Sequence, residues 1–183
     1  MANPVCQWFF TPLQAVATIA SAVNCGGSLF QPLMVMPLLG PSVNIPIQYQ
    51  GTQVIRLLAD SEFWFPKINA MATLSNLILT GFAMRYSSAS PLAAEKLKYY
   101  IAAASLNLAT TVWTLGFMAP KYNTPLKRLA KSMDERAYKG QEFASEEKEF
   151  RGVQKEWMTG AYVRGAIMLG AAVASIMPFM VSV

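Results

Sequence analysis

The residues of this chain best suited to chemistry are an arginine inside an apolar segment and two carboxylic acids near the start of another. Arg164 follows Trp157 by seven residues, so it lies about 10 Å inside the apolar helix that Trp157 begins. An arginine near mid-membrane costs at least about 2.5 kcal/mol, so Arg164 is expected to face a partner, water or a ligand. The alternative is that its side chain snorkels to the cytosolic surface. Asp60 and Glu62 could be acid–base groups or ordinary interfacial charges.

The residue types that are missing narrow the chemistry further. The chain contains no histidine, which excludes a His-ligated haem, a His-rich metal centre and any Ser-His-Asp or Cys-His catalytic set. Its two cysteines do not form a C-x-x-C pair. No metal or nucleotide motif is present, so we predict no cofactor and no metal site. The net charge is +5, but most of the basic residues lie in one segment, over residues 120–156, where they are mixed with nearly as many acids, which predicts no nucleic-acid partner.

Uncharged polar residues recur at helical spacing within the apolar segments. Each set falls on one face of a helix. The three sets are Ser21, Asn24, Ser28 and Gln31; Asn69, Thr73, Asn76 and Thr80; and Tyr100, Asn107, Thr111 and Thr114. Such stripes either hold membrane helices together through hydrogen bonds or line a polar cavity, and the spacing alone leaves both interpretations open.

The elements that must position these residues are membrane helices. The chain has 183 residues, of which 54% are hydrophobic and only 14% charged, whereas soluble domains carry about 25% charged residues. Four apolar stretches reach the roughly 20 residues that span a bilayer, over residues 12–39, 63–84, 97–118 and 157–181. We therefore predict a single all-α transmembrane domain over residues 1–183, a bundle of four transmembrane helices.

The connecting segments are unequal in length and charge. The first, over residues 40–62, is rich in Pro and Gly and then predicts a short extra helix over residues 51–59. The third, over residues 120–156, is long, charged and helical, with Pro125 at a first helical position. Lys and Arg concentrate on the side of these two segments, eleven against three, which predicts that both face the cytosol. The membrane is predicted to be the endoplasmic reticulum.

This orientation gathers several polar and aromatic side chains in the cytosolic half of the membrane. We expect a pocket that opens toward the cytosolic leaflet, next to Asp60 and Glu62. Its predicted substrate-binding residues are Gln31, Asn69, Trp64, Thr114, Tyr162 and Trp157. The predicted catalytic residues are Asp60, Arg164 and Asn123, with Asp60 chosen as the base from its position alone.

Three short motifs resemble a known family. The segment from Ala119 to Leu126, APKYNTPL, resembles the small-apolar, Pro, x, x, Asn, then Leu pattern of the anthrone oxygenase-like family, formerly a domain of unknown function. Trp157 and Arg164 reproduce its Trp-x6-Arg entry to the fourth helix, and residues 26–32 resemble its Gly-rich segment that leads to a Pro. The resemblance covers nearly the whole chain.

The resemblance implies a fold of four membrane helices and the oxidation of anthrones to anthraquinones without a cofactor. The positions carried over are Asn123, Trp157 and Arg164. We expect Arg164 to stabilise an oxyanion, Asn123 to orient the substrate by hydrogen bonds, and Trp157 to stack on it. The chain departs from expectation in having no imidazole base, so a carboxylate, a tyrosine such as Tyr162, or water must serve.

The sequence is compatible with three functions. The first is a cofactor-free oxygenase acting on a lipophilic polyketide-like intermediate. The second is an acid–base cyclase or isomerase of a terpenoid or other hydrophobic intermediate, with Asp60 or Glu62 as proton donor and Trp64, Trp113 or Trp157 stabilising a cation. The third is a non-catalytic membrane scaffold for a pathway enzyme. The expected partners are the bilayer, a hydrophobic small molecule, and either a second copy or a pathway enzyme.

Overall fold

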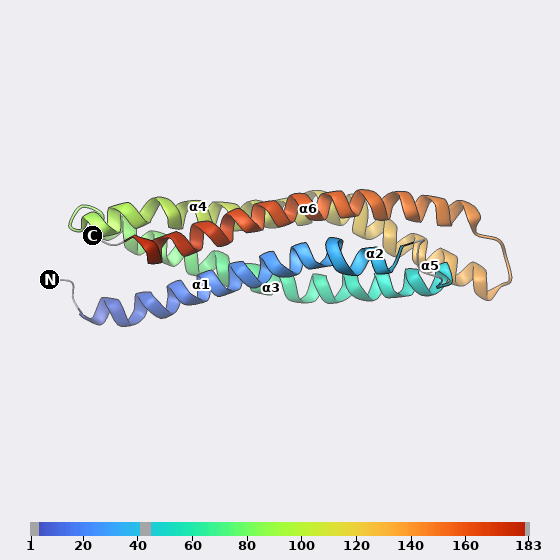
Figure 1. The fold of residues 1–183 in the computed structure, drawn as a ribbon, viewed down its shortest axis with the longest axis horizontal. Coiled ribbons are helices and arrows are strands. Elements are labelled where there is room, and N and C mark those ends of the chain that lie inside the picture. The colour runs from blue at the N-terminus through green and yellow to red at the C-terminus, as the bar shows by residue number, and fades with distance from the viewer. Residues whose placement is uncertain (1–3, 41–44, 182–183) are drawn as a thin grey trace. The chain divides into compact units, whose positions relative to one another are not determined.

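Every regular element of the described chain is a helix. The computed structural model describes residues 4–40 and 45–181, with side chains from residue 10 onward. The elements in chain order are α1 (Pro4–Phe30), the π-helix η1 (Gln31–Val35), α2 (Met36–Leu38), α3 (Ile47–Tyr86), α4 (Pro91–Trp113), the π-helix η2 (Thr114–Asn123), α5 (Thr124–Tyr138) and α6 (Ala144–Met180) (Figure 1).

Three helical runs among the described residues are long and apolar enough to cross a membrane. They are Phe10–Leu38, Pro91–Tyr138 and Ala144–Met180. The second predicted span, residues 63–84, lies in α3, which is not among the three and which carries buried polar residues such as Asn69 and Asn76. The chain is thus an all-α membrane protein, as its composition predicts.

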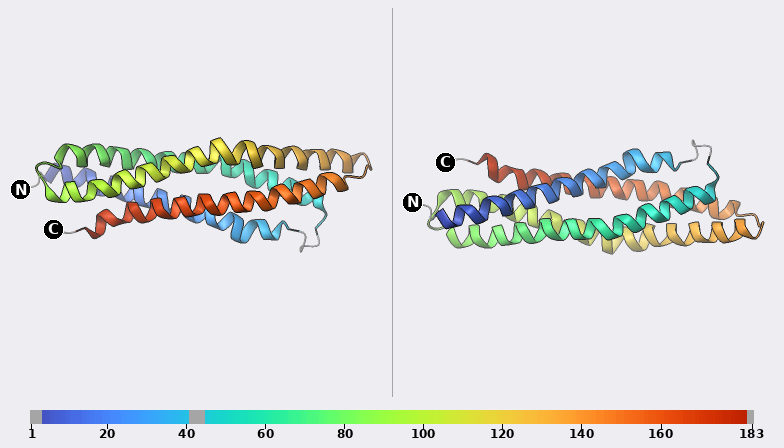
Figure 2. Two further views of the ribbon diagram at one scale, coloured as in Figure 1. Left: turned by 90° about the horizontal axis from the view of Figure 1, so that it is seen from above. Right: turned by 90° about the horizontal axis from the view of Figure 1, so that it is seen from below.

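The helices extend further than the apolar stretches do. The short helix predicted over residues 51–59 is helical, but it is the first part of α3 rather than a separate element. Likewise α4, η2 and α5 form one uninterrupted run (Figure 2), and α6 begins at Ala144 instead of Trp157. Only a short turn, where Gly140 has a φ of 64°, separates these two long runs. The charged residues on both sides of it therefore belong to helices.

The chain divides into two compact units. Unit 1 comprises Met1–Gly26, Phe65–Thr111 and Gly165–Val183, and unit 2 comprises Gly27–Trp64 and Val112–Arg164. Each unit contains segments of four helical runs. In unit 1 these segments have roughly 20 residues and a length of about 30 Å, which is the thickness of the hydrocarbon core of a bilayer.

Unit 1 buries polar residues and exposes apolar ones. Its outward residues include Ile19, Val23, Leu74, Ile101, Leu108, Leu169, Val173 and Ile176. Its buried polar residues include Ser21, Asn24, Asn69, Asn76, Asn107 and Ser175. Ser21 and Ser175 lie 3.3 Å apart, and Asn24 donates to Asn69 at 3.0 Å. Because lipid is as apolar as leucine, this arrangement suits helices that pack against one another in a membrane.

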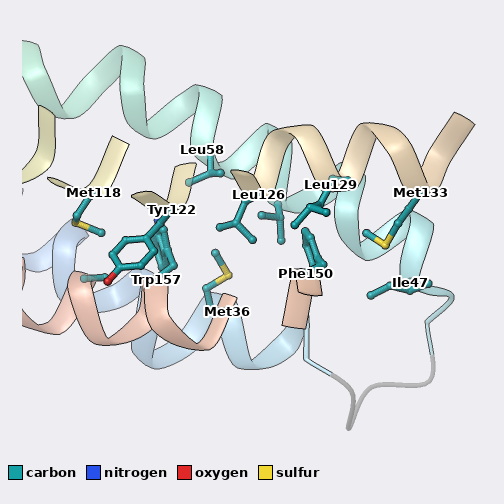
Figure 3. Packing of buried hydrophobic residues seen from close by; sticks show 13 residues of the cluster. Met36, Ile47, Leu58, Met118, Tyr122, Leu126, Leu129, Met133, Phe150 and Trp157 are labelled. Carbon is teal, nitrogen blue, oxygen red and sulfur yellow. The ribbon is translucent and has the colours of Figure 1, made fainter. Parts of the chain in front are cut away.

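Unit 2 has a conventional apolar core. The core residues include Met36, Ile47, Leu58, Met118, Tyr122, Leu126, Leu129, Met133, Phe150 and Trp157 (Figure 3). They come from α2, α3, η2, α5 and α6, so the charged segment predicted as a third loop supplies about half of the packing. Gly51 allows α3 to approach α5 closely, since a Cβ there would lie 3.1 Å from Ala130 Cβ. The core fixes the positions of the polar residues described next.

Candidate functional site

Both π-helices lie in unit 2, and each carries a predicted site residue. Gln31 is the first residue of η1, and Asn123 is the last residue of η2. The wider register is seen in the amide of Met36, which donates to Gln31 O, and in the amide of Thr124, which donates to Ala119 O. Each π-helix contains a proline, which lacks an amide proton and disfavours a regular α-helical ladder. π-Helical turns are frequent at functional sites.

A first chain of hydrogen bonds runs from Trp157 to a carboxylate. The indole Nε1 of Trp157 donates to Asn123 Oδ1 at 2.9 Å, and Asn123 Nδ2 donates to Glu62 Oε1 at 3.2 Å. Lys127 forms an ion pair with the other carboxylate oxygen, Glu62 Oε2. Since an indole can only donate, it fixes which end of the Asn123 amide faces Glu62. The carboxylate is therefore held in one position by an amide and a cation.

Burial decreases along this chain. Trp157 is only 1% exposed and belongs to the apolar core beside Met118 and Tyr122 (Figure 3). The Glu62 and Lys127 side chains are 44% and 35% exposed. This chain of hydrogen bonds thus connects a buried indole to a partly exposed carboxylate.

A second chain of hydrogen bonds holds the buried arginine. Arg164 Nη2 donates to Gln31 Oε1 at 3.1 Å, and both residues are only 6% exposed. Gln31 Nε2 in turn donates to Ser61 Oγ, whose hydroxyl donates to Leu57 O. Arg164 therefore lies inside unit 2 with an amide partner instead of extending to a surface. Burying a guanidinium is costly, so a buried arginine is a candidate site for binding an anion.

Both chains of hydrogen bonds connect α6 to α3. Ser61 and Glu62 are neighbours on α3, and Trp157 and Arg164 lie two turns apart on one face of α6. Between them on α6, Gly160 leaves room for Tyr122, because a Cβ there would lie 3.0 Å from Tyr122 Cε2. Unit 2 therefore brings a carboxylate and a buried cation to the same pair of helices.

Helix phase separates Asp60 and two other predicted residues from these chains. Asp60 and Trp64 each lie two residues from Glu62 on α3 and are exposed, and Tyr162 lies two residues from Arg164 on α6 and is 40% exposed. Positions two residues apart point to different faces of a helix. Among the described contacts, no hydrogen bond joins Asp60 to either chain. The base that we predicted from position alone thus lies on the face of α3 away from Asn123.

Two further predicted residues have different surroundings. Asn69 belongs to unit 1, where its amide accepts from Asn24 and donates to Thr111 Oγ1 at 2.8 Å and to Asn107 O at 2.9 Å. Thr114 is the half-buried first residue of η2. Within unit 2 the structure joins Asn123 with Trp157 and Gln31 with Arg164, and the described hydrogen bonds of Asn69 lie within unit 1.

Lys127 and Ser61 belong to these chains of hydrogen bonds but were not predicted from the sequence. Lys127 follows Asn123 by four residues, and this spacing places both on one face of a continuous helix. This spacing would have identified Lys127 if residues 120–138 had been predicted as one helical run. Ser61 carried no signal, because a serine between Asp60 and Glu62 is typical of any polar helix surface. Within the described residues, no cluster of three or more His, Cys, Asp or Glu could hold a metal ion.

The arrangement defines an all-α membrane protein with a carboxylate–amide–indole chain and a buried arginine. The profile of a family described as anthrone oxygenase matches residues 62–174, which is more than half of the sequence. The chain belongs to the anthrone oxygenase family. The matched region contains Glu62, Asn123, Trp157 and Arg164, whereas Gln31 and Ser61 precede it. Comparisons with curated proteins and with solved structures found no match.

Proposed function

We propose that the chain is an integral-membrane tailoring enzyme that oxidises an anthrone-like polyketide intermediate with molecular oxygen and without a cofactor. Membership of the anthrone oxygenase family supports this class of reaction. In the overall reaction, one anthrone and one O₂ give one anthraquinone and one water. Such a reaction requires a base, a group that stabilises the resulting oxyanion, and a site that limits access of water.

The observation that carries the proposal is the position of Glu62 between Asn123 and Lys127. We assign Glu62, in place of Asp60, as the base that removes a proton from the methylene carbon of the anthrone. Its partial exposure allows it to pass that proton to water. In this assignment Asn123 and Trp157 are positioning residues: they act through Glu62, and Trp157 lies in the core rather than against the substrate.

Arg164 is assigned as the group that stabilises the oxyanion. Removal of the proton places negative charge on the anthrone oxygen, and a fixed buried cation stabilises charge that develops in a site of low dielectric. The electron-rich anion then gives one electron to O₂, and the two radicals combine at the deprotonated carbon. The resulting peroxide anion takes up a proton from water, which replaces the one that Glu62 removed. The hydroperoxide then loses water, together with the remaining hydrogen of that carbon, and becomes the second carbonyl of the quinone.

Oxygen uptake by the detergent-purified protein tests this proposal. Emodin anthrone is the substrate, and heat-inactivated protein measures the background autoxidation. We expect the intact protein to accelerate oxygen uptake, with one quinone formed for each O₂ consumed. No acceleration by folded protein would contradict the proposal and would favour a non-oxidative cyclase or isomerase.

We also propose that the protein resides in the endoplasmic reticulum membrane with residues 120–156 in the cytosol. The excess of Lys and Arg in this segment supports that orientation. A single cysteine at Lys131, in a background that lacks the two native cysteines, is expected to react with an impermeant maleimide on sealed microsomes. Protection of that cysteine until the microsomes are opened would reverse the orientation.

A further inference from the structure

The last turn of α1 and the first residue of η1 bring two polar side chains to one face in unit 2. Ser28 and Gln31 are three residues apart, and they are 1% and 6% exposed. Both lie before the region that the family profile matches, which begins at residue 62. Family membership therefore assigns neither of them a role.

Gln31 is held from both ends. Its amide nitrogen donates to Ser61 Oγ, and its amide oxygen accepts from Arg164 Nη2. Because Ser61 is itself fixed by its bond to Leu57 O, rotation of the Gln31 amide would break two hydrogen bonds at once. Gln31 consequently sets the position of a buried positive charge.

Ser28 places a hydroxyl group inside unit 2. It is buried, and the hydrogen bonds of the described chain leave its Oγ without a partner. Serines inside helices usually bond to the carbonyl four residues earlier, and burying a hydroxyl without any partner is unfavourable. An unpaired hydroxyl one helical turn from the amide that holds Arg164 is suited to bind an oxygen atom of a ligand.

We propose that Gln31 is a positioning residue for Arg164, and that Ser28 joins them in a subsite for two neighbouring oxygens on one edge of a flat phenolic ligand. Arg164 binds the oxygen that carries negative charge, and Ser28 forms a hydrogen bond to the hydroxyl beside it. The inference rests on the proposed function for the ligand class. It assigns to α1 and η1 the discrimination between ligands whose oxygens are adjacent and those whose oxygens are apart.

Two isomeric dyes test the subsite without turnover. 1,8-Dihydroxyanthraquinone has its hydroxyls beside a carbonyl, whereas 2,6-dihydroxyanthraquinone has them at the far corners. Binding is measured by quenching of tryptophan fluorescence in detergent, and ionisation of the bound dye by its visible absorption. We expect wild type to bind the 1,8 isomer about tenfold more tightly. We also expect that dye to ionise about one to three pH units lower when bound, because a fixed cation favours the anion.

Variants of Ser28 and Gln31 test the roles of these two residues separately. Ser28→Ala is expected to reduce the isomer preference to about threefold or less while the bound dye still ionises at low pH. Gln31→Glu places a carboxylate against the guanidinium, so the bound dye is expected to ionise no lower than the free dye. Ser132→Ala, a half-buried serine on α5, is the control and should match wild type. Should Gln31→Glu fail to fold, the small change Ser28→Ala decides the proposal by itself.

The outcomes distinguish this inference from the proposed function. Equal binding of the two isomers by wild type, or an isomer preference that Ser28→Ala leaves unchanged, would overturn the subsite even when the protein consumes oxygen. Isomer preference and dye ionisation as expected, without oxygen uptake, would support the subsite and contradict the oxidation.

Discussion

The two units bury similar polar residues for different purposes. In unit 1 the polar side chains bond to neutral groups, either to one another across helices, as Asn24 does to Asn69 and Ser21 to Ser175, or to backbone carbonyls, as Asn76 does to Ala72 O. In unit 2 they lead to charged groups, as Asn123 does to Glu62 and Gln31 to Arg164. Unit 1 contains five of the 25 charged residues of the chain, and unit 2 contains the rest.

This difference bears on the two interpretations of the polar stripes, which were hydrogen bonding between helices and the lining of a polar cavity. Hydrogen bonds between membrane helices contribute about 0.6 kcal/mol on average, which is enough to set the register of helices in lipid. The unit 1 stripes fit that role. Gln31 and Asn123 instead bond to ionised groups, which neutral packing does not require. We therefore expect substitutions in unit 1 to lower stability and substitutions in unit 2 to lower activity.

The largest effect is expected at the two carboxylates of α3. Glu62→Gln removes the proposed base but keeps an acceptor for Asn123, so the turnover rate should fall by about 100- to 10,000-fold. Asp60→Asn makes the same change two residues away, on another face of the helix, and should alter the rate by less than about twofold. Steady-state oxygen uptake measures both. Equal losses in the two variants would assign them to general electrostatics rather than to a base.

A smaller effect is expected at two asparagines, one in each unit. Asn123→Ala frees Glu62 from its amide partner, and we expect about a tenfold to 100-fold loss of turnover. It also leaves the buried Trp157 N–H without its acceptor, so unfolding stability should fall by about 1–3 kcal/mol. Asn69→Ala removes bonds to Asn24 and Thr111, and it should lower unfolding stability by about 1–2 kcal/mol while turnover changes by less than about twofold. Thermal unfolding in detergent and oxygen uptake are compared for both. Loss of turnover in Asn69→Ala would end the division of roles between the units.

Two tryptophans of unit 2 sharpen the comparison within that unit. Trp157→Phe removes the N–H that orients Asn123, so we expect about a tenfold loss of turnover with most of the packing kept. Trp113→Phe removes an N–H that donates to Gly160 O at 3.1 Å and not to Asn123, and should leave turnover within about twofold. A similar loss in both variants would indicate that the indoles act only through packing.

The sequence predicted the helices but not where they end. Apolar length identifies a segment that lies in lipid, and this signal stops when charges begin, although α6 continues back to Ala144 and α3 to Ile47. For the same reason the apolar core of unit 2 was not foreseen, because it is built partly from the charged segment that contains α5. Helix phase was available from the sequence, since Asp60 lies two residues from Glu62 and therefore points to another face of α3. The π-helices were not predictable, since a proline is equally compatible with a kink.

The smallest effect is expected at two glycines of different units. A Cβ at Gly26 in unit 1 would meet nothing within 4 Å, whereas a Cβ at Gly160 in unit 2 would lie 3.0 Å from Tyr122 Cε2 and 3.5 Å from Met118 Cε. Gly26→Ala is therefore expected to raise unfolding stability by up to about 1 kcal/mol, since alanine restricts the unfolded chain and favours a helix. Gly160→Ala gains the same preference but must displace the Tyr122 ring, so its stability should fall or stay unchanged. Because Gly160 lies on the α6 face between Trp157 and Arg164, that displacement should also lower turnover, while Gly26→Ala should not. A Gly160→Ala variant that is more stable and fully active would contradict this prediction. It would show that the Tyr122 ring can move without disturbing the hydrogen bonds of Trp157 and Arg164.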